Sequence, residues 1–159
     1  MLALGTFALF SSSLATQASA ATTVPVSMTF TEPILQNVNS GCPALGTPNG
    51  GFCGNGIFLP YGHATEMIVF GAGTPEIDMR TVTVARGSIV LQEQATDFTC
   101  PGVCGSPEFP GGPFGATLTD VVVSGTGIFA GASGNLSGTV KGTGLQSHIK
   151  LSGSITLAN

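Results

Sequence analysis

Hydrophobic and polar residues alternate along most of the chain after residue 20, as in strands with one buried face. The first such run extends from Val24 to Glu32, and every second residue from Val24 to Phe30 is apolar. Further strands are predicted at residues 56–71, 78–86, 88–96, 114–124, 134–143 and 147–157. Pro60-Tyr61-Gly62 interrupts the second run, either as a turn between two strands or as a bend within one. The count is therefore seven or eight strands, and no segment shows the periodicity or the caps of a helix.

Short connections between these runs favour antiparallel neighbours, which leaves two architectures for an all-β chain of this size. One is a closed up-and-down barrel and the other is a two-sheet β-sandwich. Two longer loops, residues 33–55 and 97–113, are rich in glycine and proline. If Pro60-Tyr61-Gly62 is a turn, these loops follow the first and fifth strands and lie at the same end of a barrel.

A glycine-rich segment at residues 124–134, SGTGIFAGASG, joins two of the predicted strands. Its glycines, which permit the positive φ angles of a sharp reversal, are Gly125, Gly127, Gly131 and Gly134. Phe129 is the one large aromatic residue within it. We expect the Phe129 ring to close the adjoining end of the barrel; the alternative is an ordinary hairpin with an incidental phenylalanine.

The same segment resembles the GGTGxFxGAxG turn of the allene oxide cyclase and dirigent barrels, and still more that of their bacterial secreted relatives. In those relatives a Gly/Thr-rich strand pair follows and ends in a "GxI" strand, which here is Leu151 to Ile155. Residues 59–65, LPYGHAT, are similar to another strand-opening motif of the group. The resemblance covers residues 114–157 and implies an eight-stranded barrel with an apolar interior, no cofactor and often a homo-oligomer. Allene oxide cyclases and dirigents act on apolar small molecules inside the barrel.

The length of the chain and its N-terminal segment predict an exported protein with a single domain. Residues 1–20 are similar to a secretory signal, with an apolar stretch from Leu2 to Leu14 and the small residues Ala18-Ser19-Ala20 at the cleavage site. No Lys or Arg precedes that stretch; an upstream true start would account for this, and an uncleaved apolar arm is the alternative. Residues 21–159 then form one barrel domain with no membrane span in the mature chain. Four Lys/Arg residues are too few to bind nucleic acid.

Export makes the four cysteines candidates for disulfides. Local pairing, Cys42 with Cys53 and Cys100 with Cys104, is favoured over cross-pairing, because the first pair brackets a Gly/Pro-rich segment and the second brackets Pro-Gly-Val. A zinc site from the same thiols is the rival, which an oxidising compartment disfavours. We predict no metal.

The chain lacks the standard catalytic signatures, including GxSxG, a Walker loop and HExxH. His63 and His148 belong to no ligand-like cluster. The remaining signal is a set of charged residues in phase with apolar strand positions: Glu32, Arg80, Arg86, Glu93 and Asp120. If those faces point inward, the charges line or rim an apolar cavity where burial and pairing shift pKa values. Alternatively, the charges sit at a wet rim, or the Arg80–Arg86 strand turns its other face inward.

Three hypotheses for function follow. The first is a secreted barrel that binds an apolar small molecule or serves as a non-catalytic extracellular module. The second is a cofactor-free isomerase or cyclase of the allene oxide cyclase or dirigent kind, with Glu32, Tyr61, Glu93 and Asp120 as candidate catalytic residues. The third is a structural interaction protein that uses its disulfide-stapled loops. An open apolar pocket with converging polar groups would favour the second, and a filled interior the third.

Overall fold

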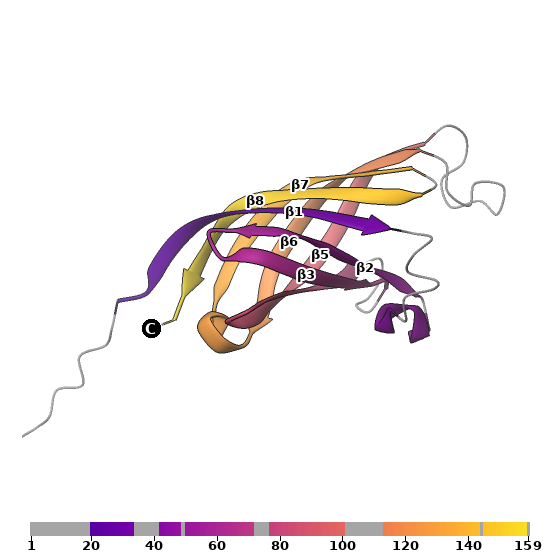
Figure 1. Ribbon diagram of the computed structural model, residues 1–159. Helices are drawn as coiled ribbons and strands as arrows, with labels where there is room; N and C mark the ends of the chain where they lie inside the picture. Colours follow the sequence, from indigo (N-terminus) through magenta and orange to yellow (C-terminus); the bar gives the residue numbers. More distant parts are fainter. Residues whose placement is uncertain are drawn as a thin grey trace, which may run out of the picture.

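The computed structural model describes residues 20–33, 42–48, 50–71, 77–100, 113–143 and 145–158, and these form a closed barrel of eight antiparallel strands (Figure 1). The predicted signal segment lies outside the described residues, apart from Ala20. The strands are β1 (Thr22–Pro33), β2 (Gly51–Leu59), β3 (Gly62–Val69), β4 (Ile77–Val84), β5 (Gly87–Thr99), β6 (Phe114–Gly125), β7 (Ser133–Gly142) and β8 (Gln146–Leu157). Two 3₁₀ turns, η1 (Pro43–Gly46) and η2 (Gly127–Phe129), accompany them.

Each strand pairs with its neighbours in sequence, and β8 pairs with β1 along its whole length, from Thr22 opposite Leu157 to Pro33 opposite Gln146. This closing pair removes both free edges of the sheet. The up-and-down barrel prediction is confirmed, and the sandwich alternative is wrong.

Pro60 and Tyr61 form a true turn between β2 and β3, which settles the strand count at eight. The chain therefore leaves β1 and β5 at the same end of the barrel, as predicted for a true turn. Cys42 and Cys53 form the predicted disulfide. Cys100 is also disulfide-bonded, whereas Cys104 lies outside the described residues.

Several strands are longer than predicted, and the extension is largest at β2 and β5. β2 starts at Gly51 instead of residue 56, because its glycines let neighbouring backbone approach closely. A Cβ on Gly56 would lie only 1.9 Å from the carbonyl oxygen of Thr29 on β1. β5 continues to Thr99 through an irregularity at Asp97, which has a φ of 52°. The predicted loops at 33–55 and 97–113 are correspondingly too long.

The inward faces of the strands form one apolar core, which η2 closes at one end of the barrel. Phe129 is fully buried, stacks on Phe58 with ring centroids 5.6 Å apart, and meets the edge of Tyr61 at 4.8 Å. The prediction that Phe129 closes this end is confirmed. Figure 1 shows η2 at one end of the barrel and η1 at the other.

The glycines of the η2 segment serve two purposes. Gly127, Gly131 and Gly134 have the expected positive φ angles. Gly125 does not, so the prediction is wrong for that residue. There the requirement is space, because a Cβ on Gly125 would lie 2.3 Å from the carbonyl oxygen of Phe129.

Candidate functional site

The half of the barrel interior away from η2 contains a buried polar cluster, defined here as Glu32, Glu66, Arg80, Glu93, Asp120 and Ser147. These residues come from β1, β3, β4, β5, β6 and β8, and each is at most 4% exposed. Strand alternation places them inside, since each lies in phase with buried apolar residues of its own strand. We call this half of the barrel the mouth.

Arg80 is the centre of the polar cluster. Its Nε donates to Glu93 Oε2 at 2.7 Å and its Nη2 to Glu93 Oε1 at 3.0 Å, which is a bidentate pair. Its Nη1 donates to Glu32 Oε1 at 3.2 Å and also to Glu66 Oε2. One guanidinium therefore joins three carboxyl groups from three different strands.

Asp120 lies directly opposite Glu93 in the β5–β6 register, and neither of its carboxyl oxygens has a hydrogen-bond partner among the described residues. Burial, followed by the neighbouring Glu93 carboxylate, raises the pKa of Asp120 to about 8. Asp120 is therefore largely protonated at neutral pH.

Burial has a similar effect on the pKa values of two other carboxyl groups of the polar cluster. Burial raises the pKa of Glu66 to about 8, and the Arg80 guanidinium only partly opposes this. Burial also raises the pKa of Glu32, against the effects of Arg80 and the nearby Ser147 hydroxyl. Burial alone would lower the pKa of Arg80, but its carboxylate partners raise it well above the ordinary value. Arg80 therefore stays charged, whereas Glu32 and Glu66 hold a proton more tightly than an ordinary carboxyl group does.

A cavity of about 250 Å³ opens onto this polar cluster, and we call it the mouth cavity. Its polar lining is Glu32, Asp78, Arg80, Glu93 and Ser147. Its apolar wall is formed by Phe52, Ile68, Phe70, Ala95, Phe98, Phe114, Leu118 and Val140. The Ser147 hydroxyl is buried and makes no hydrogen bond of standard geometry with the described residues. An apolar wall with a few convergent polar groups is typical of small-molecule sites.

The predicted site residues divide between the two ends of the barrel. Glu32, Glu93 and Asp120 come together in the polar cluster, and Glu32 and Glu93 line the mouth cavity. Tyr61 packs against Phe58 and Phe129 at the opposite end, so the structure does not bring it together with the carboxylates. Arg80 points inward, whereas Arg86 is exposed beyond the end of β4.

Sequence reasoning missed Glu66 and Ser147. Glu66 lies between buried Ala64 and Ile68 at a spacing of two, which was a usable signal. The intervening Met67 and the following Val69 are also apolar, and they hide the phase of β3.

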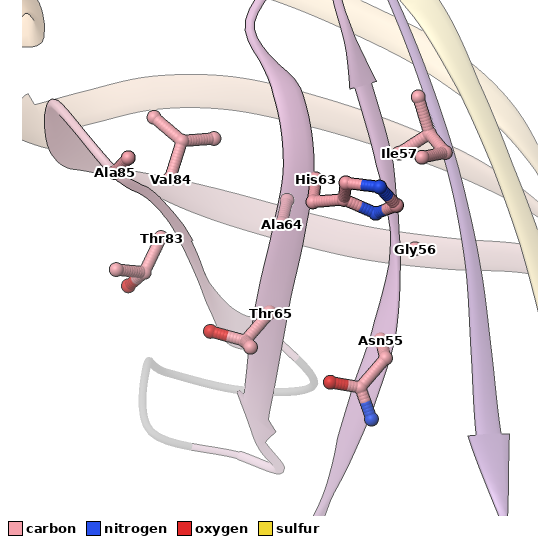
Figure 2. Close-up of a pocket in the computed structure, with 9 residues that line it drawn as sticks. All are labelled: Asn55, Gly56, Ile57, His63, Ala64, Thr65, Thr83, Val84 and Ala85. Atoms are coloured by element: carbon pink, nitrogen blue, oxygen red, sulfur yellow. The ribbon is translucent and has the colours of Figure 1, made fainter.

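A second depression, of about 440 Å³, lies beside β2 and β3 near Cys53, and a third, of about 690 Å³, lies on the outer wall of β2, β3 and β4. Figure 2 shows the residues of the third, including His63, Asn55 and Thr65 on neighbouring strands. His63 and His148 are both exposed, and the lining of this outer depression includes no charged carboxylate or guanidinium. The outer depression therefore lacks the buried charged groups of the mouth cavity, and the mouth cavity is the stronger candidate site.

Among the described residues, no group of three or more His, Cys, Asp or Glu side chains is placed to hold a metal ion. No helix in the same part of the chain is long and apolar enough to cross a membrane. Comparison with protein-family models, curated proteins and solved structures finds no match to this chain.

Proposed function

We propose that the protein is a secreted barrel that binds a small, largely apolar molecule in the mouth cavity. One observation carries this proposal: a cavity with four phenylalanines in its wall opens onto buried polar groups, including the Ser147 hydroxyl. Protein interiors are normally close-packed, so a cavity of this kind calls for an occupant. At about 250 Å³, the cavity suits a ligand smaller than a typical drug-sized molecule.

Export is part of the proposal. The apolar segment before residue 20 and the Cys42–Cys53 disulfide both support an oxidising, extracellular or periplasmic location. Membership of the allene oxide cyclase and dirigent group remains a proposal, supported by the glycine-rich turn and by the eight-stranded barrel.

Binding is tested by filling the cavity. Ala95 lines it, while the next residue, Thr96, is exposed on the outer face of β5. Cyclohexanol is a neutral probe of suitable size, and its binding can be followed by NMR titration. We expect saturable binding to the wild type and to the control Thr96→Phe, and loss of binding in Ala95→Phe. Equal binding to both variants, or none to the wild type, would overturn the proposal.

A cofactor-free isomerase or cyclase is the second candidate, and Glu32 is the observation that favours it. Glu32 lines the cavity, and burial raises the pKa of its carboxyl group, so it can carry a proton at the edge of an apolar space. Glu93 is held in a bidentate pair by Arg80, and Asp120 is not part of the cavity lining. For turnover of an apolar substrate, Glu32→Gln should abolish activity while retaining binding; unchanged turnover would exclude Glu32 as the proton carrier.

The third hypothesis, a structural interaction protein, called for a filled interior. The open mouth cavity argues against it.

A further inference from the structure

The mouth cavity has more acidic groups around it than basic ones. Glu32, Glu66 and Glu93 surround the single guanidinium of Arg80, and Asp120 lies opposite Glu93. The half-buried Asp78 is the third carboxyl group of the lining, with Glu32 and Glu93. Full ionisation would leave a large negative charge in a poorly solvated space, and burial accordingly raises the pKa values of Glu32, Glu66, Asp78 and Asp120.

Arg80 has little hydrogen-bonding capacity left for an anionic ligand. A guanidinium has five N–H groups, and four hydrogen bonds already run from Arg80 to the three glutamates. A carboxylate or phosphate entering the cavity could form a bidentate pair only by displacing one of these partners, and it would still face the surplus of acidic groups.

We call the three carboxyl groups of the lining, Glu32, Asp78 and Glu93, the acidic floor. The apolar wall of the mouth cavity is also suited to a cation. Four phenylalanines, Phe52, Phe70, Phe98 and Phe114, contribute to it, and Phe52 and Phe70 meet edge to face with ring centroids 5.4 Å apart. Aromatic faces attract organic cations through the ring quadrupole. The Ser147 hydroxyl, buried in the lining beside Glu32, has lone pairs that can accept a hydrogen bond from an ammonium group.

From the acidic floor, the phenylalanine wall and the buried Ser147 hydroxyl, we infer that the ligand of the mouth cavity is a small organic cation, an alkyl- or arylammonium. This inference rests on the proposed binding function. The ammonium group would sit against Glu32, Glu93 and Ser147, and the apolar body against the phenylalanines. In binding, the cation would take the place of a proton on one of the carboxyl groups.

Binding should therefore release protons and strengthen with pH. The titratable and charged groups that line this space are Glu32 on β1, Asp78 and Arg80 on β4, and Glu93 on β5. Glu66 on β3 and Asp120 on β6 belong to the same polar cluster but are not part of the lining. The described lining residues from β2 and β7 are Phe52 and Val140, which carry no charge. Between pH 6 and pH 8 Glu66 and Asp120, whose pKa values are both about 8, begin to lose their protons, whereas Arg80 keeps its charge.

The test compares three probes of one shape: cyclohexylamine, cyclohexanol and cyclohexanecarboxylate, each titrated into the full chain and followed by NMR. At pH 8 we expect the amine to bind about tenfold more tightly than the alcohol, and the carboxylate about tenfold more weakly. The preference for the amine should be smaller at pH 6. Ala95→Phe should abolish binding of all three.

Variants separate charge from packing. Glu32→Gln should reduce the amine preference severalfold while cyclohexanol still binds, and Asp97→Asn, which alters an exposed carboxylate, should leave it unchanged. If Glu32→Gln does not fold, Asp120→Asn removes a carboxyl group of the same polar cluster and should act in the same direction. Binding of the alcohol without preference for the amine would overturn the cation inference alone. Absence of binding by every probe would overturn the proposed function as well.

Discussion

Replacing Asp120 by asparagine should remove a large part of the pH dependence of stability. Asp120 is 1% exposed, faces Glu93 across the β5–β6 pair, and has no hydrogen-bond partner for either oxygen among the described residues. An asparagine side chain is close in shape to the protonated acid and is likewise uncharged. Asp120→Asn therefore reproduces the neutral state at every pH.

The sign and size of this pH dependence follow from the pKa of Asp120, which is about 8 in the folded protein against an ordinary value of 3.8. The folded state holds the Asp120 proton more tightly than the unfolded chain does. The stabilisation of the folded state by this proton is therefore fully present below pH 3.8 and is lost as the pH rises toward 8. Between pH 5 and pH 7 the folded protein keeps the proton and the unfolded chain has lost it. At 1.36 kcal/mol per pH unit, the wild type should lose about 3 kcal/mol from this residue alone.

Urea unfolding at pH 5, 6 and 7 measures this directly. We expect the free energy of unfolding of Asp120→Asn, taken relative to the wild type, to increase by about 3 kcal/mol from pH 5 to pH 7. Asp97→Asn, which changes an exposed carboxylate, is the matched control and should show no such increase. A difference between Asp120→Asn and the wild type that is constant across this range would refute the buried, protonated state of Asp120.

Three further variants test the contacts that stabilise the barrel. Arg80→Met leaves the surrounding carboxylates unpaired and should destabilise the protein by about 3–5 kcal/mol at pH 7, and by less at pH 5, where the carboxyl groups accept protons more readily. Phe129→Ala empties the closed end and should lower the free energy of unfolding by about 3–5 kcal/mol. Replacing Cys42 and Cys53 together by serine opens a ring with a sequence separation of 11. That double change should cost about 3 kcal/mol in chemical unfolding.

Matched controls use exposed side chains of the same types. Arg86→Met and Phe98→Ala should each change stability by less than about 0.5 kcal/mol, since Arg86 is exposed and Phe98 is 58% exposed. If Arg80→Met or Phe129→Ala fell in the same range as its control, the corresponding account of the interior would be wrong.

The sequence predicts the fold well because strand alternation is strong and the connections are short. The run from Val24 to Glu32, the closing role of Phe129 and the Cys42–Cys53 bond all depend on local pattern, and all are confirmed. Strand limits were less accurate at β2, where glycines permit close approach of neighbouring backbone and the chain reads as a loop.

The candidate site was only partly predictable. Alternation correctly indicated that Glu32, Glu93 and Asp120 face inward. The convergence of Glu32, Glu66 and Glu93 on Arg80 depends on the stagger between strands β1, β3 and β5. Single-strand patterns carry no information on that stagger. Tyr61 was misplaced for a related reason: the turn that precedes β3 puts it at the far end of the barrel from these charges.

The most direct test of small-molecule binding in the mouth is to locate a bound probe by intermolecular nuclear Overhauser effects. With cyclohexanol added to the full chain, we expect contacts from its ring protons to Phe52, Phe70 and Phe114, which line the mouth cavity. Contacts to His63 and Thr65, on the outer depression of β2 to β4, would instead place the ligand outside the barrel. That result, or the absence of any contact at saturating cyclohexanol, would contradict the account.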